Sequence, residues 1–144
     1  MIYQASLSDI DKIIPCAVEY TDIIPGMEFN PGHYTAFWGN MLKSGAGAIF
    51  LSEKDGVVEG GIGGIKYPEI LSGRLTAVEC FWYMSKKSRG NGIKLYFKFK
   101  QWAKEQGCKR LAMIYLPCSM PEKLKKFYEL EGFILTEMHY EVAL

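Results

Sequence analysis

The segment MSKKSRGNGIKLYFKFKQWAKEQG, residues 84–107, combines seven Lys and Arg residues with aromatic side chains and three glycines. After Gly92, the residues Leu95, Phe99 and Trp102 recur at helical spacing, and lysines occupy the opposite face. The pattern predicts a helix whose aromatic side chains pack in the core. It argues against a nucleic-acid surface, because stacking on bases requires exposed rings.

A glycine turn precedes this helix. The apolar run LTAVECFWYM, residues 75–84, predicts a central strand, and SKKSRGNG then leads into the helix. A strand, a glycine turn and a helix N-terminus together present backbone N–H groups and the positive end of the helix dipole, which suits a phosphate. The alternative is an ordinary connecting loop with solvated lysines, and local physics leaves both open.

Length and charge limit the function classes. The chain has 144 residues, 49% of them hydrophobic, and a net charge of +1, which predicts one globular domain over residues 1–144 and no polycation. Residues 86–110 nevertheless hold nine basic side chains against one acidic one, and residues 1–42 hold five acids against one lysine. We therefore expect an anion near the middle of the chain and a cation near its start.

The order of expected elements predicts an α+β fold. Asp55-Gly56 is a hairpin turn signal, and the glycine run 60–64 lies inside a strand pattern, where it predicts close backbone approach or a bulge. The predicted strands are 2–5, 48–53, 57–67, 75–84, 110–116 and one or two within 133–144, and the predicted helices end near residues 20, 45, 106 and 131.

Several site classes find no support in the sequence. The two histidines, His33 and His139, are far apart, so no metal is expected. The N-terminus does not resemble a secretory signal, and no apolar run approaches the ~20 residues that span a bilayer. We expect a soluble, cytoplasmic protein that does not enter a membrane.

Two motifs carry a family resemblance. Residues 87–92, Lys-Ser-Arg-Gly-Asn-Gly, resemble the Q/R-x-x-G-x-G/A signature of the GNAT (GCN5-related) N-acetyltransferases. Residues 127–133, FYELEGF, are similar to the family's common lYeklGF segment, and the order of elements agrees. The resemblance implies the acyl-CoA N-acyltransferase fold, with a mixed sheet of six to seven strands and about four helices.

The resemblance also implies acetyl-CoA as cosubstrate, with no metal. Its diphosphate would bind main-chain amides of the glycine turn, and its pantetheine would pair with the preceding strand. Lys87 stands where the family has Gln or Arg, which keeps the positive charge of Arg but loses its forked geometry. Pro121 stands where many members have Asn. The implied contacts are Trp82 and Met84 for pantetheine, and Lys87, Arg89, Gly90, Asn91, Gly92 and Ile93 for the diphosphate.

Acetyl transfer to an amine requires a base, oxyanion stabilisation and an acid for the leaving thiolate. Glu79 is the candidate base, because alternation along the strand would place it beside Ala77, Phe81 and Tyr83, and burial would raise its pKa. An exposed or paired structural glutamate is the alternative. Tyr128 matches the family tyrosine that protonates the thiolate, and packing is its alternative role.

The acceptor and the general function stay open. Glu19, Asp22 and Glu28 would suit a cationic amine, although acidic loops also serve solubility. The primary expectation is an N-acetyltransferase acting on a small amine or on a protein lysine or N-terminus. A catalytically silent acyl-CoA-binding or regulatory module is the first alternative, and a nucleic-acid-binding domain the second. Dimers are frequent in the family, so a homodimer is compatible with the resemblance.

Overall fold

The computed structural model describes residues 1–144, apart from the side chain of Arg89. The positive charge that this side chain is expected to add at the glycine turn therefore lies outside the described residues, whereas the main chain of Arg89 is described. The chain divides into two units, Met1–Ile114 and Tyr115–Leu144.

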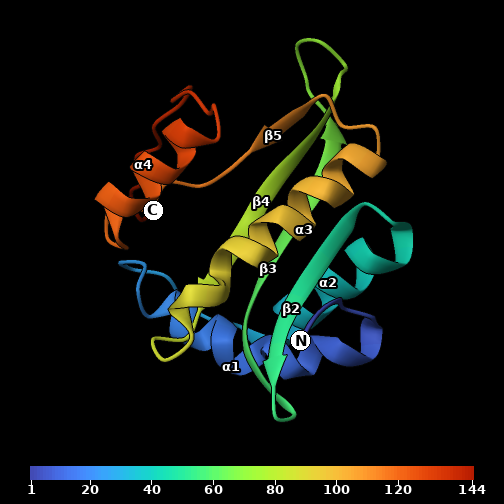
Figure 1. Ribbon diagram of the computed structural model, residues 1–144. Helices are drawn as coiled ribbons and strands as arrows, with labels where there is room; N and C mark the ends of the chain where they lie inside the picture. The colour runs from blue at the N-terminus through green and yellow to red at the C-terminus, as the bar shows by residue number, and fades with distance from the viewer. The chain divides into compact units, whose positions relative to one another are not determined.

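The first unit contains one mixed sheet of five strands in the order β1-β2-β3-β4-β5 (Figure 1). Neighbouring strands are antiparallel, except that β4 and β5 run parallel and pair only at residues 76–78. Their bounds are β1 Ile2–Gln4, β2 Gly47–Lys54, β3 Val57–Pro68, β4 Leu75–Met84 and β5 Arg110–Ala112. The expected strand 110–116 is thus shorter than its sequence pattern indicated.

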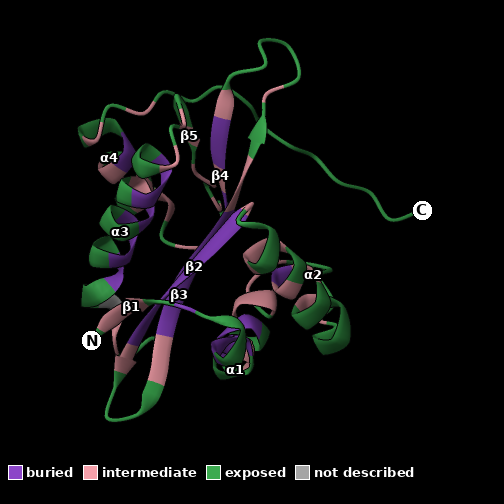
Figure 2. Cartoon of the chain, turned by 90° about the vertical axis from the view of Figure 1, so that its right-hand side faces the viewer, coloured by how far each residue is buried: buried purple, intermediate pink, exposed green. Residues whose placement is uncertain are grey.

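Helices cover both faces of this sheet. Helices α1 (Ile10–Thr21) and α2 (Pro31–Ser44) lie on one face, and α3 (Gly92–Glu105) lies on the other (Figure 2). The apolar stripe of α3 is buried through Leu95, Phe99 and Trp102, as its spacing predicted. The aromatic residues of this stripe are therefore core residues and not a stacking platform for bases.

The glycine run in β3 permits close packing on both faces of the sheet. A Cβ atom on Gly63 would lie 2.3 Å from Cε1 of Phe81 and 2.9 Å from Cη2 of Trp38. A Cβ on Gly64 would lie 2.3 Å from Cζ of Phe99, which belongs to α3 on the opposite face. The strand register also shifts between Gly63 and Gly64. The expected close approach and bulge are both confirmed.

Gly63→Ala is expected to lower the free energy of unfolding by about 2 kcal/mol, because the added methyl group overpacks two buried rings. Urea unfolding followed by circular dichroism measures the change. Gly39→Ala in α2 is the matched control, since a Cβ there meets nothing within 4 Å. Equal stability of the two variants would contradict the packing account.

The second unit contains α4 (Pro121–Leu130) and no strand. The side chain of Tyr128 on α4 packs between Phe127 and Phe133, with ring centroids 5.9 and 5.3 Å away. The expectation of one or two closing strands within 133–144 is wrong, because this segment forms no ladder with a neighbour and a strand needs a partner. The sheet accordingly has five strands where six to seven were expected.

Candidate active site

A bulge in β4 sets the direction of the glutamate expected to be catalytic. Gly63 pairs with Phe81 and Gly64 pairs with Glu79, so Cys80 is the extra residue. Residues paired across antiparallel strands share a face, and Gly64 faces α3. Glu79 therefore also faces α3.

The bulge overturns the expected set of neighbours. Ala77 lies in the core beneath α3, and it does share the face of Glu79. Phe81 and Tyr83 instead lie in the core beneath α1 and α2. The prediction that these two aromatic residues flank Glu79 is wrong, because one extra residue reverses the alternation of side chains.

The carboxyl group of Glu79 is buried where the two central strands stop pairing. The residue is 3% exposed, and its Oε2 accepts a hydrogen bond of 3.0 Å from the backbone N–H of Ile114. Ile114 follows β5, whose last residue paired with β4 is Ala112. Burial raises the pKa of Glu79 to about 8, although the Ile114 hydrogen bond opposes the rise. The expected burial and raised pKa are confirmed.

Beyond this point β4 stays paired with β3, but the main-chain groups of alternate β4 residues point away from β3. The Ser85 N–H donates to the Glu59 carbonyl at 2.8 Å, and hydrogen-bonded pairs alternate along an antiparallel ladder. Ser85 and Glu59 therefore form a hydrogen-bonded pair. Counting back from it, the pairs of Trp82 with Ile62 and of Met84 with Gly60 are non-hydrogen-bonded ones. The main-chain groups of Trp82 and Met84 consequently point towards the side on which β5 has already ended. The pantetheine contacts of these two residues stay a prediction, which this orientation favours.

The two glycines of the turn have different surroundings. A Cβ on Gly90 would meet nothing within 4 Å, so nothing in the folded chain requires glycine there. A Cβ on Gly92 would lie 3.3 Å from Cγ of Met84, and the Trp82 indole N–H donates to the Gly92 carbonyl at 3.1 Å. Gly92 therefore fixes the start of α3 against β4, whereas Gly90 borders open space.

The main-chain N–H groups of the glycine turn differ in whether they are hydrogen-bonded within the turn itself. No side chain of Ser88 or Asn91 caps the short 3₁₀ turn η2 (Arg89–Asn91) or the start of α3. The Asn91 N–H, however, donates to the Ser88 carbonyl at 3.2 Å. That amide closes the turn, and its contact with the diphosphate, which would replace this hydrogen bond, stays a prediction. The main-chain amides of Arg89, Gly90, Gly92 and Ile93 also stay as predicted donors, and Lys87 is exposed beside them.

A contact between α1 and β4 was missed by sequence reasoning. The Tyr83 hydroxyl donates a hydrogen bond to the exposed carboxylate of Glu19. The Tyr20 ring meets the Tyr83 ring edge-on, with centroids 6.2 Å apart. The negative charge of Glu19 indicated a possible binding region here. The contact with Tyr83 could not be predicted, because the bulge decides on which face of the sheet Tyr83 lies. Nothing local in the sequence indicates the Ile114 hydrogen bond either.

Comparison with known proteins identifies the family. The model of the acetyltransferase (GNAT) family matches residues 16–133. The chain belongs to this family. It is therefore an acetyltransferase, as the two motifs implied.

Solved structures agree with the GNAT fold. A ribosomal-protein-alanine N-acetyltransferase from Brucella melitensis biovar Abortus 2308 is 20% identical, with 100% of this chain and 99% of that chain covered and a TM-score of 0.72. A predicted acetyltransferase from Clostridium acetobutylicum, solved with acetyl-CoA, is 19% identical, with 99% and 95% covered and a TM-score of 0.77. AAC(6')-Iy, solved with a bisubstrate analogue, is 17% identical, with 100% and 97% covered and a TM-score of 0.76. No curated protein matches the sequence.

Two further findings concern sites that the sequence did not support. Among the described residues, no three His, Cys, Asp or Glu side chains are grouped so that they could hold a metal ion. No helix in the described part of this GNAT chain has the length and apolar character needed to cross a membrane.

Proposed function

We propose that this GNAT protein transfers an acetyl group from acetyl-CoA to a primary amine. The observation that carries the proposal is the buried carboxyl of Glu79, whose pKa is about 8 and which lies where β4 and β5 stop pairing. A base with a pKa near the working pH is suited to removing a proton from an ammonium group.

The backbone of the first unit suits a CoA thioester, which supplies the activated acetyl group when bound. Trp82 and Met84 would pair with the amide groups of pantetheine through their main-chain atoms. The amides of Arg89, Gly90, Asn91, Gly92 and Ile93 would hold the diphosphate at the positive end of the α3 dipole. Lys87 would add a positive charge beside them. Solved relatives were crystallised with acetyl-CoA or CoA, which supports this assignment.

The remaining steps use three groups of this chain. Glu79 accepts a proton from the acceptor ammonium, directly or through a water molecule, so that the neutral nitrogen can form the new C–N bond. The amide of Cys80, at the bulge, stabilises negative charge on the thioester oxygen. Tyr128 gives its hydroxyl proton to the sulfur as the C–S bond breaks, and the second proton that the nitrogen loses on becoming an amide restores the tyrosine hydroxyl.

Charge at the end of α1 favours an acceptor with a second positive group. Glu19 presents an exposed carboxylate that Tyr83 orients, and the Tyr20 ring lies edge-on to the Tyr83 ring. Carboxylates and aromatic faces both bind ammonium groups. Solved proteins of this fold include aminoglycoside acetyltransferases, which supports a polycationic acceptor.

Thiol release in the presence of an amine panel tests the function. We expect saturable acetyl-CoA binding by calorimetry, and faster CoA release with diamines and aminosugars than with neutral monoamines. Glu19→Gln should raise KM for the cationic acceptors about fivefold and leave acetyl-CoA binding unchanged. Asp11→Asn, in the first turn of α1, is the control for loss of one exposed charge. Equal effects of the two variants would remove Glu19 from acceptor binding, and undetectable acetyl-CoA binding would refute the function itself.

The same measurements address the second candidate, a silent acyl-CoA-binding module. Saturable acetyl-CoA binding without thiol release from any amine would favour it. The buried position and raised pKa of Glu79 favour catalysis instead, because a purely structural carboxyl gains nothing from a pKa near neutrality.

A further inference from the structure

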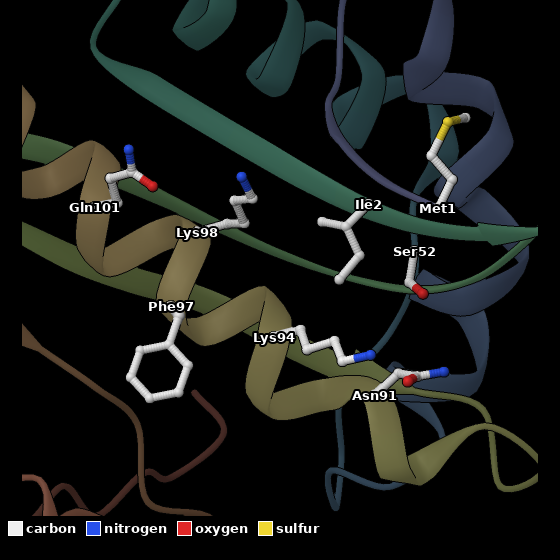
Figure 3. A pocket seen from close by; sticks show the side chains of 8 residues that line it. All are labelled: Met1, Ile2, Ser52, Asn91, Lys94, Phe97, Lys98 and Gln101. Carbon is white, nitrogen blue, oxygen red and sulfur yellow. The ribbon is translucent and has the colours of Figure 1, made fainter.

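A hollow of about 590 Å³ lies between α3 and the edge of the sheet formed by β1 and β2 (Figure 3). Ile2 and Ser52 line it from the strands, and Asn91, Lys94 and Lys98 line it from the start and outer face of α3. All of these residues belong to the first unit. The hollow is therefore defined within one compact body.

The hollow carries positive charge that nothing nearby neutralises. Lys94 and Lys98 are one helical turn apart on α3, and no acidic side chain lines the space. Neither lysine makes a hydrogen bond or an ion pair within the described part of the chain. In Figure 3 the Lys94 side chain extends towards Asn91 and Ser52.

Ser52 adds an observation of a different kind. The residue is 4% exposed, on β2 between Ile2 of β1 and Gly60 of β3. Its hydroxyl has no hydrogen-bond partner among the described residues, although it borders the hollow. The hydroxyl oxygen is not among the side-chain atoms that are sealed from solvent without a partner, so it is open to a ligand in the hollow that accepts its hydrogen bond.

We propose that this hollow binds a small phosphorylated metabolite, at a second anion site that shares only the Asn91 side chain with the glycine turn. Two ammonium groups, one hydroxyl and the carboxamide of Asn91 form a set rich in donors, which matches a phosphate monoester because its oxygens only accept. The volume exceeds that of a phosphate alone and falls within the range of small-molecule sites. Ile2 provides apolar surface for the organic part.

Titration of the ¹⁵N-labelled protein with inorganic phosphate and with glycerol 3-phosphate tests the site. We expect saturable shifts of the backbone amides of Ile2 and Ser52. Lys98→Ala should weaken binding about fivefold, and Ser52→Ala about threefold. Lys104→Ala is the matched control, since it removes the same charge from the last turn of α3, outside the hollow. Equal weakening by Lys98→Ala and Lys104→Ala would overturn the site in favour of diffuse attraction.

Two further arms decide the ligand class and the independence of the site. Malonate that binds as tightly as phosphate would overturn the assignment to phosphate. With acetyl-CoA at saturation, the phosphate-induced shifts at Ile2 and Ser52 should persist. Their loss, or shifts confined to Gly90 and Gly92, would show that phosphate occupies the donor site, and the second site would be rejected. Neither result depends on whether the enzyme transfers acetyl groups.

Discussion

Glu79→Gln is expected to lower kcat at pH 8 by about 100-fold while acetyl-CoA binding changes little, because the variant loses the proton acceptor but keeps its shape. With a pKa of about 8, only about a tenth of the wild-type carboxyls are ionised at pH 7. The wild-type rate should therefore rise with pH through about 8 and then level off, whereas the variant should show a flat profile.

The free energy of unfolding of the wild type should fall with rising pH, whereas its rate of acetyl transfer should rise. The pKa of Glu79 is raised from 4.5 when unfolded to about 8 when folded, so its protonated form stabilises the fold at low pH. That contribution is complete below about pH 4.5 and is lost as pH rises towards 8. Glu79→Gln cannot ionise, and its amide oxygen can still accept from the Ile114 N–H. The variant should therefore gain stability relative to wild type between these pH values.

Thiol-release assays across pH 5–9 measure the effect on turnover, and thermal unfolding over the same range measures the effect on stability. Glu59→Gln, on the neighbouring strand β3, is the control for an ordinary glutamate of the sheet. If Glu79→Gln turned over as fast as wild type at every pH, Glu79 would be a structural residue. The raised pKa would then reflect burial alone.

Gly90→Ala is expected to weaken acetyl-CoA binding about 30-fold without destabilising the protein. The methyl group would enter open space in the folded chain, since a Cβ there meets nothing within 4 Å. It would occupy the position proposed for the diphosphate and block one or two charge-assisted hydrogen bonds, a loss of ~2 kcal/mol. Calorimetry with acetyl-CoA measures the effect.

The control for this variant is Gly39→Ala in α2, which also adds a methyl group in open space. It should bind acetyl-CoA as wild type does. Unchanged binding by Gly90→Ala would place the diphosphate elsewhere, even if acetyl transfer itself were confirmed. If Gly90→Ala unfolds at the same temperature as wild type, its weaker acetyl-CoA binding arises at the binding site and not from a loss of stability.

Much of the scaffold could be predicted from local patterns. The apolar stripe of α3, the hairpin at Asp55-Gly56 and the strand 75–84 follow from periodicity and turn chemistry, which act over a few residues. The segment 133–144 was mispredicted for the same reason, since strand propensity says nothing about whether a pairing partner is present.

The site was predictable in composition but not in geometry. Glu79 and the glycine turn could be chosen from residue types and motif spacing. The hydrogen bond from Ile114, 35 residues further along the chain, had no local signal. Tyr83 was assigned to the wrong face because strict alternation assumes an unbroken ladder.

The amino-acid order by itself determined the family motifs, the buried face of α3 and the presence of a carboxyl on the central strand. Only tertiary structure decided which way that carboxyl points and how strongly it holds its proton. The bulge at Cys80 occurs where rings from both faces press against Gly63 and Gly64, and this packing depends on residues distant in the chain. The pKa of Glu79 likewise depends on all the atoms that exclude water from it, which no short stretch of sequence specifies.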